Sequence, residues 1–364
     1  MTRRATHLVL ATGASLTIAA LWSCSPLPVR NDAGIAPTPV ESPAPSGAAP
    51  LVLNSEPWTY DNFPGTVTTT AWFRIYSTST RGSVRDRLPR FLETAIGHYR
   101  TAIAPLGPPP EQMEVYVMGS RPQWERLTQR LMGPEASTYT QIPRGGFTSR
   151  KRSILWDMGP RDTLTITAHE GWHLYTQNTF ADPLPVALEE GIATYMEGFR
   201  RGEDGTPVFN PWSNFERFME LRRVVNDGGL VPLADLLRSA PQDLMARDNG
   251  GDAALRYYAQ VWALTHFLVE GDGGKHKAAL QRMLLDAQNG RLSDAVSRSM
   301  GQRAARLHAV RRKGVDVLAV YTGVPSDSLD AAYRDFVRDV VRVGAGEFIR
   351  RGQSPVSSTA DAAK

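Results

Sequence analysis

Two histidines lie four positions apart in the segment TITAHEGWHLY, residues 165–175. Residues four apart lie on the same face of an α-helix, so His169 and His173 would project side by side if this segment is helical. Two neighbouring imidazoles can bind one zinc ion, each at about 2.0–2.1 Å. The spacing therefore predicts that His169 and His173 are two ligands of a zinc ion.

Glu170 completes the pattern HExxH, in which a glutamate follows the first histidine. On a helix its side chain is rotated by about 100° from that of His169, so it can reach a water molecule near the metal without binding the metal. A carboxylate there can accept a proton from water whose pKa the metal has lowered towards about 7, and can then pass it to a leaving amine. The pattern is the one that a metal hydrolase needs, and we assign Glu170 as the general base.

A pair of adjacent glutamates follows in the segment PVALEEGIATYME, residues 185–197. If Glu190 faces the metal, small residues such as Ala193 share its helical face, which would let this helix approach the first one closely. Glu189 would share its face with bulkier residues, among them Met196. We therefore expect Glu190 to be the third ligand, with Glu189 as the alternative.

Hydrophobic patterns predict the elements that must position these residues. Runs of β-branched and aromatic residues bounded by turn residues indicate strands. Such runs lie at 70–78, at 113–119 and in a hairpin over 145–159 whose second arm is 152–157. Strands that alternate with helices and are followed by helices alone predict an α+β fold.

Apolar residues at spacings of three and four indicate the helices. One is expected at 84–104, and another runs from an N-cap at Ser120 to about Met132. Asp162 is expected to cap the helix that carries the histidines. The remaining helices are expected at 186–200, 211–226, 232–239, 252–270, 275–288, 292–300 and 326–342. The catalytic domain would then cover 69–342, with an α+β lobe at 69–180 and a helical lobe at 181–342.

The N-terminal segment, residues 1–23, has a basic start, an apolar stretch and then small residues, which is the layout of a secretory signal peptide. Cys24 follows directly, in a context that resembles the bacterial lipobox, where the cysteine is lipidated. We expect a lipid-anchored protein of the bacterial cell envelope; a plain signal peptide with an incidental cysteine is the alternative. Residues 24–68 are rich in Pro, Ala and Ser and predict a flexible tether, and residues 343–364 predict a disordered tail.

Charge and cysteine content exclude other classes of protein. The chain of 364 residues has a net charge of only +4, and it contains no basic run of the kind that binds nucleic acid. Cys24 is the only cysteine, so no disulfide can form within one chain. The core must therefore be stabilised by packing. The oligomeric state cannot be read from these features.

The chain resembles a zinc metallopeptidase of the gluzincin type, the broad group that contains thermolysin. The resemblance rests on HExxH, on the short loop that follows and on the pattern P-x-x-x-x-E-G-x-A at 185–193, and it spans roughly residues 70–342. Bacterial lipoprotein peptidases of that group are especially similar. The resemblance implies a thermolysin-like zincin fold, one Zn²⁺ ion per chain bound by His169, His173 and Glu190, and a peptide or protein substrate.

The same resemblance implies a donor that stabilises the negative oxygen formed during hydrolysis. The segment LRYYAQVWALTHFL, residues 255–268, is similar to the gluzincin helix in which a tyrosine precedes an aromatic-Ala-Leu stretch. By this match Tyr258 takes the role and Tyr257 is the alternative. An aromatic helix face packed in the core is the other interpretation of this segment.

Further residues are candidates for supporting roles. Glu197 and Asp157 could orient the histidines from their outer sides. His266 lies on the same helical face as Tyr258, but a lone histidine there is more typical of a core position.

The substrate class is predicted from less. The strand at 152–157 could bind an extended peptide by edge pairing. No further carboxylate is clearly placed to bind a free N-terminus, which favours an endopeptidase. The alternative function is a non-catalytic envelope lipoprotein that uses a zincin-like body as a binding or assembly module.

Overall fold

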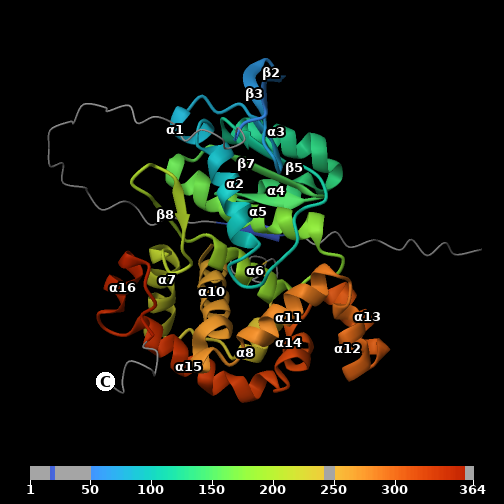
Figure 1. Ribbon diagram of the computed structural model, residues 1–364, viewed down its shortest axis with the longest axis vertical. Coiled ribbons are helices and arrows are strands. Elements are labelled where there is room, and N and C mark those ends of the chain that lie inside the picture. The colour runs from blue at the N-terminus through green and yellow to red at the C-terminus, as the bar shows by residue number, and fades with distance from the viewer. Residues whose placement is uncertain (1–16, 21–50, 242–250, 357–364) are drawn as a thin grey trace, which may run out of the picture.

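The computed structural model describes residues 17–20, 51–241 and 251–356, and Figure 1 shows their arrangement. A mixed β-sheet lies at one end of the molecule and a group of helices lies at the other. The helices that carry the predicted metal ligands, α5 (Pro160–Thr179) and α6 (Val186–Met196), lie between these two parts. A mixed α/β part followed by helices was predicted, and this coarse architecture is confirmed.

The sheet has the strand order β1-β6-β7-β5-β4-β3-β2. Its centre is parallel and consists of β4 (Phe73–Ser77), β5 (Met113–Met118) and β7 (Arg152–Trp156). β6 (Gly145–Ser149) is antiparallel to β7 and continues the sheet outwards. The prediction that the strand at 152–157 offers a free edge is wrong, because β7 is paired with β5 on one side and with β6 on the other.

The outer side of β6 pairs with β1 (Thr17–Ala20), a short antiparallel strand. β1 also packs against α5 and against α10 (Gly251–Gly274). It belongs to the segment predicted to be a signal peptide. The rest of that segment and Cys24 lie outside the described residues.

The N-terminal edge of the folded body lies earlier than predicted. β2 (Asn54–Tyr60) and β3 (Phe63–Thr69) form an antiparallel hairpin that joins the sheet through β4. Asp61 and Asn62 form its two-residue turn with φ of 46° and 65°, the left-handed geometry that such a turn requires. The predicted flexible tether at 24–68 is therefore too long at its C-terminal end.

Helices cover both faces of the sheet because the strands carry apolar residues on both. α2 (Leu88–Tyr99) and α5 pack on one face, and α3 (Arg121–Met132) packs on the other. Along β7, Leu155 joins the core on the α5 side, while Ile154 and Trp156 join the core on the α3 side. This alternation follows from the two-residue period of a strand.

Proline starts several of these helices. Pro89 and Pro122 lie in the first turns of α2 and α3, and Pro160 begins α5 directly after Gly159. Proline suits this place because the first backbone N–H groups have no partner within the helix. Asp162, predicted to be the N-cap of α5, lies inside its first turn instead, where a negative charge complements the helix dipole.

The helical part is built around α10, which packs against α6, α7 (Phe215–Asn226) and α15 (Ser326–Val341). Shorter helices complete it: α8 (Leu233–Arg238), α11 (Lys277–Gln288), α12 (Leu292–Met300), α13 (Gln302–Arg311), α14 (Gly314–Thr322) and α16 (Ala345–Arg351). On the sheet side lie α1 (Gly82–Arg85) and α4 (Ala136–Thr140). None of the described helices is long and apolar enough to cross a membrane.

Several predicted boundaries in this part are wrong. The helix predicted at 211–226 begins only at Phe215. The helix predicted at 186–200 ends at Met196, and Phe199–Arg201 form β8, which pairs with β9 (Pro207–Phe209). The predicted disordered tail begins too early, because Ile349 of α16 is buried.

Candidate metal centre

Three potential ligand atoms converge between α5 and α6. The Nε2 atoms of His169 and His173 are 3.2 Å apart. Oε2 of Glu190 lies 3.3 Å from the first of these nitrogens and 3.5 Å from the second. All three residues are buried, and together they could hold a metal ion. The structure thus brings together the three residues predicted as ligands.

The separations suit a small divalent cation. Four ligands at about 2.0–2.1 Å from a zinc ion in tetrahedral geometry lie about 3.3–3.4 Å from one another. The three observed separations, 3.2, 3.3 and 3.5 Å, scatter around that value. Both carboxylate oxygens of Glu190 are buried without a hydrogen-bond partner among the described residues, which is costly unless a cation compensates them.

Carboxylates on the outer side fix the orientation of both imidazoles. Nδ1 of His169 lies 2.8 Å from Oε1 of Glu197, and Nδ1 of His173 lies 3.0 Å from Oε1 of Glu189. A carboxylate only accepts hydrogen bonds, so each Nδ1 carries the hydrogen, and in the neutral ring each Nε2 presents a lone pair. Two lone pairs and a carboxylate facing one another require a cation or extra protons.

Glu197, on the His169 side, belongs to a fully buried ion-pair network. Arg217 of α7 donates from Nη2 to Oε1 of Glu197 at 2.8 Å and from Nε to Oε2 at 3.0 Å. Asn214 adds a bond from Nδ2 to Oε2 at 2.9 Å. Burial by itself disfavours the charged form, but the Arg217 guanidinium and His169 hold the pKa of Glu197 at about 2. The predicted orienting role of Glu197 agrees with this geometry.

Glu189, on the His173 side, has fewer hydrogen-bond partners than Glu197. Oε1 of Glu189 accepts a bond from Oγ1 of Thr176 at 2.7 Å in addition to the bond with His173. The sequence leaves Glu189 as the alternative to Glu190 for the third ligand. In the structure its carboxylate contacts the outer nitrogen of His173, whereas the Glu190 carboxylate contacts the inner nitrogens of both rings.

The electrostatics of the group favour a positive charge at its centre. Burial lowers the pKa of His173, but the nearby Glu190 and Glu189 carboxylates outweigh it and raise that pKa to about 10. Burial opposes ionisation of Glu190, yet His173 and His169 lower its pKa to about 2. In the metal-free protein a proton on the histidines therefore takes the place that a cation would fill.

Glu170 points to the sheet side of α5. Its Oε2 accepts a hydrogen bond from Oγ1 of Thr148 on β6 at 2.7 Å, while Oε1 is buried without a partner among the described residues. Burial raises the pKa of Glu170 above its ordinary value, while His173 and His169 oppose the shift. A carboxylate held at one oxygen and unbonded at the other can exchange a proton with a nearby water molecule.

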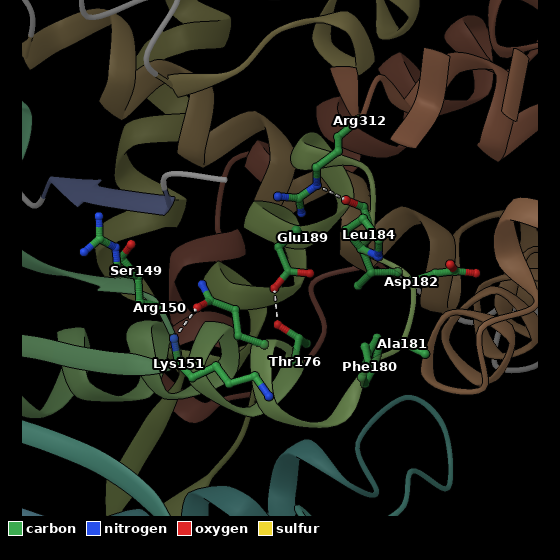
Figure 2. A pocket seen from close by; sticks show the side chains of 12 residues that line it. Ser149, Arg150, Lys151, Thr176, Phe180, Ala181, Asp182, Leu184, Glu189 and Arg312 are labelled. Atoms are coloured by element: carbon green, nitrogen blue, oxygen red, sulfur yellow. Dashed lines mark hydrogen bonds between the residues drawn. The ribbon is translucent and has the colours of Figure 1, made fainter. Parts of the chain in front are cut away.

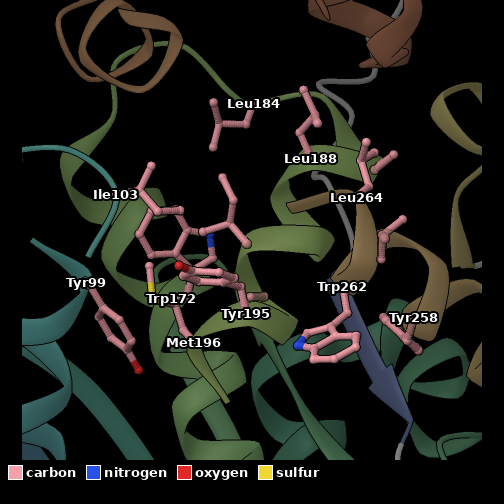
Figure 3. Close-up of a cluster of buried hydrophobic side chains, with 14 of the residues drawn as sticks. Tyr99, Ile103, Trp172, Leu184, Leu188, Tyr195, Met196, Tyr258, Trp262 and Leu264 are labelled. Atoms are coloured by element: carbon pink, nitrogen blue, oxygen red, sulfur yellow. The ribbon is translucent and has the colours of Figure 1, made fainter. Parts of the chain in front are cut away.

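The middle of α5 packs closely against α2. Tyr99 of α2 donates a hydrogen bond from its hydroxyl to the Ala168 carbonyl at 2.7 Å. A Cβ atom at Gly171 would lie 2.6 Å from that hydroxyl oxygen, so only glycine leaves room for it. Tyr99 and Trp172 meet edge to face in the aromatic cluster shown in Figure 3. The glycine within HEGWH therefore allows α5, with both histidines, to lie this close to α2.

α6 is held against α10 in a similar way. A Cβ atom at Gly191 would lie 2.7 Å from the Val261 carbonyl oxygen of α10. This close approach explains why a glycine follows Glu190. It also brings α10, with Tyr258, beside the metal ligands.

Tyr258 lies beside the candidate ligands. Its buried ring meets that of His169 edge to face, with centroids 5.8 Å apart, and the Arg217 guanidinium lies 5.1 Å from its centroid. Burial, reinforced by the Glu190 carboxylate, raises the pKa of Tyr258 well above that of a free phenol. Tyr257, the alternative, directs its hydroxyl to the Ser239 carbonyl at 3.4 Å. The structure thus brings Tyr258 to the site and turns Tyr257 towards α8.

Two other candidates lie elsewhere. His266 stacks on Trp212 with ring centroids 3.7 Å apart and contacts Glu270, so it is a core residue as expected. Asp157, considered as a partner for a histidine, instead accepts bonds from Ser79 and Arg81. It therefore supports the turn before α5.

Sequence reasoning missed several members of the site. Thr148, Thr176, Asn214 and Arg217 are polar residues whose roles depend on elements far apart in the chain. The segment SNFER, residues 213–217, carried one signal, because asparagine is favoured at the N-cap and Asn214 does cap α7. It could not indicate which carboxylate its arginine would bind.

Comparisons of this chain with protein-family models, with curated proteins and with solved structures gave no match.

Proposed function

We propose that this protein is a zinc-dependent peptidase of the gluzincin type, with a thermolysin-like zincin fold. The observation that carries the proposal is the convergence of His169, His173 and Glu190 at separations of 3.2–3.5 Å, next to a buried glutamate with one unbonded oxygen. A structural zinc site usually has four protein ligands and no need of such a glutamate. Here three residues supply ligands, and Glu170 has no role in the packing that requires a charge.

A zinc ion held by these three residues would supply Lewis acidity, lowering the pKa of water and polarising a carbonyl group. Glu170 takes the proton from the attacking water at Oε1 and delivers it to the leaving nitrogen. Thr148 holds the other oxygen of Glu170, so the carboxylate keeps one orientation through both transfers. The raised pKa of Glu170 makes it a stronger base for this purpose than an exposed glutamate.

Tyr258 is the proposed donor to the oxygen that becomes negative in the transition state. Its ring lies against His169, and its raised pKa keeps the phenol protonated, and therefore able to donate, across the physiological range. A donor placed before the reaction in a site without bulk water costs no reorganisation when charge develops.

A peptide is the proposed substrate because an extended segment already fits beside the metal centre. Thr17–Ala20 pair with β6 and pack against α5 and α10, the helices that carry the histidines and Tyr258. Backbone pairing of this kind holds a chain without regard to its sequence. We further propose cleavage within chains and a lipid anchor at Cys24 in the bacterial cell envelope, both of which rest on the sequence alone.

The test is Glu170→Gln in the zinc-loaded protein. We expect one zinc ion per chain in the variant and in the parent, and a kcat on a cleaved peptide that is lower by about 10²–10⁴-fold, since the base is lost while the ligands remain. Zinc is measured by elemental analysis, and cleavage by mass spectrometry of a peptide library. Glu203→Gln, at an exposed position in the β8–β9 turn, is the matched control.

Two results would contradict the proposal. Equal kcat values in the variant and the parent would remove Glu170 from the chemistry. Bound zinc with no cleavage of any peptide by the parent would favour a binding or assembly role for the same body.

A further inference from the structure

A cavity of about 320 Å³ opens at the C-terminal end of α5. The turn between β6 and β7, the end of α5, the loop before α6, the start of α6 and the residue after α13 enclose it. Figure 2 shows residues of its lining. Those used below are Ser149, Lys151, Asp182, Glu189 and Arg312.

The cavity adjoins the metal centre. Glu189 lies on its wall and contacts the outer nitrogen of His173, whose inner nitrogen faces Glu190. The Glu189 carboxylate and the His173 ring therefore connect the cavity wall to the candidate ligand atoms. A group bound in the cavity would lie beside the Glu189 carboxylate, which contacts one of the candidate ligands.

The direction of β6 determines which end of a peptide would enter the cavity. In the antiparallel pairing, Ala20 of β1 lies opposite Gly145, and Thr17 lies opposite Thr148. The next residue of β6, Ser149, lines the cavity. A peptide that pairs with β6 in this direction therefore sends its N-terminal side into the cavity.

The carboxylates of the cavity already have donors. Glu189 accepts bonds from Thr176 and His173. Asp182 accepts bonds from the backbone nitrogen and the hydroxyl of Ser293, at 3.1 and 3.3 Å. Both bonds to Glu189 are made at Oε1, while both oxygens of Asp182 are bonded.

The cationic groups, by contrast, have hydrogens to donate. Lys151 is exposed, and its ammonium has no hydrogen-bond or ion-pair partner among the described residues. In Figure 2 this side chain extends into the cavity. Arg312 donates from Nε to the Leu184 carbonyl at 2.7 Å, while its two terminal nitrogens have no bond to any described residue. Lys151 and Arg312 therefore bring hydrogen-bond donors without a partner among the described residues to this cavity.

The turn that carries Lys151 holds it in place. Arg150 and Lys151 have φ of 51° and 62°, the left-handed geometry of a two-residue hairpin turn. The guanidinium of Arg150 is bound to Glu135 at 2.9 Å, which braces the turn from the opposite side. Lys151 is thus presented at the rim by a short, constrained connection.

We propose that this cavity is a specificity subsite that binds an acidic side chain of the substrate, on the N-terminal side of the scissile bond, through Lys151 and Arg312. The inference rests on the proposed peptidase function and adds a substrate preference to it. A carboxylate between an ammonium and a guanidinium forms charge-assisted hydrogen bonds, which are stronger than neutral ones. A basic side chain there would meet two like charges.

The test uses peptides that are acetylated at the N-terminus and amidated at the C-terminus. Glu, Gln or Lys is placed in turn at each position on the N-terminal side of one cleavage site. At one of these positions we expect kcat/KM to be about tenfold or more higher for Glu than for Gln, and lowest for Lys. Lys151→Glu should lower the ratio of Glu to Gln by at least that factor, and Arg312→Gln should lower it in the same direction. Lys277→Glu, the same charge change at an exposed lysine outside this cavity, should leave the ratio as in the parent.

A binding measurement separates failure of the subsite from failure of the peptidase. The same peptides, with a fluorophore at the C-terminal end, are titrated with zinc-loaded Glu170→Gln protein and followed by fluorescence polarisation. If the parent cleaves nothing, the peptidase proposal is wrong, and the charge dependence of binding alone judges the cavity. Equal binding of the Glu and Gln peptides overturns the subsite. So does a gain in binding on removing the acetyl group without any effect of Glu, because the cavity would then hold a free N-terminus.

Discussion

The two histidines of the candidate metal centre have surroundings of different kinds. Behind His169, Glu197 forms a buried ion pair with Arg217 and a further bond with Asn214. Behind His173, Glu189 has only Thr176 as a second partner and lies on the wall of a cavity. One side is closed by the helical part of the molecule, and the other opens to solvent.

The difference separates stability from function. A buried carboxylate and guanidinium that satisfy each other become a liability as soon as one is removed, because the other is left charged in an apolar site. A carboxylate at a cavity wall can be hydrated when its partner is lost. We therefore expect changes behind His169 to affect folding and changes behind His173 to affect metal and substrate binding.

The largest expected effect is that of Arg217→Met. Removing the guanidinium leaves Glu197 buried with a negative charge, so the free energy of unfolding of the metal-free protein should fall by about 3–5 kcal/mol. Urea unfolding in the presence of a chelator measures it. Arg223→Met, on the same helix and paired with Glu220 at the surface, should cost no more than about 1 kcal/mol. Similar losses in the two variants would mean that the buried pair has no special weight.

A smaller effect is expected from Glu189→Gln. The amide can still contact His173 but no longer makes its imidazole more basic, so the dissociation constant for zinc should rise by about 10–100-fold. Unfolding of the metal-free variant should change less than that of Arg217→Met. Competition with a chromogenic chelator measures the affinity. A loss of unfolding free energy as large as that of Arg217→Met, with zinc affinity unchanged, would contradict the expected difference between the two sides.

The pH dependence of zinc binding sharpens the same comparison. In the metal-free protein the pKa of His173 is raised to about 10, so this histidine carries a proton at pH 7 and must release it when the metal binds. The apparent affinity should therefore rise by about tenfold per pH unit from pH 6 to pH 8 for each proton released. Glu190 and Glu197, with pKa values of about 2, stay ionised throughout this range and contribute nothing to the slope. Calorimetry in buffers of different ionisation enthalpy counts the protons, and an affinity independent of pH would contradict the assignment.

The three candidate ligands could be proposed from the sequence because helix geometry places His169 and His173 on one face, and the residues around Glu190 favoured it as the inward carboxylate of the next helix. His169, His173 and Glu190 lie on two consecutive helices, and the pattern needed only local information. The orienting role of Glu197 could be predicted too, because Glu197 follows Glu190 by two helical turns in the same segment. Arg217 and Thr148 were not, because they enter the site from α7 and β6, and only the packing of distant elements brings them there.

The errors in the fold also have physical causes. The order of strands in a sheet depends on long-range pairing, so the sequence did not reveal that β7 lies inside the sheet, between β5 and β6. The hairpin of β2 and β3 was missed because Pro57, Pro64 and Gly65 interrupt its strand pattern. The helix that starts at Val186 ends at Met196, whereas it was predicted to continue to residue 200, past Gly198. A Cβ there would lie 2.2 Å from the Asn210 carbonyl oxygen, so the chain must turn away at this point.

Gly171 and Gly191 together determine how far apart the three candidate ligands lie. The first sets the position of both imidazoles against α2, and the second sets the position of the carboxylate against α10. The separations of the three ligand atoms thus depend on how closely the helices pack, and not only on the ligand side chains. A methyl group added at either glycine would meet an atom of the neighbouring helix and would displace one of the two helices, so it would change the separations of the ligand atoms without any change in the donors.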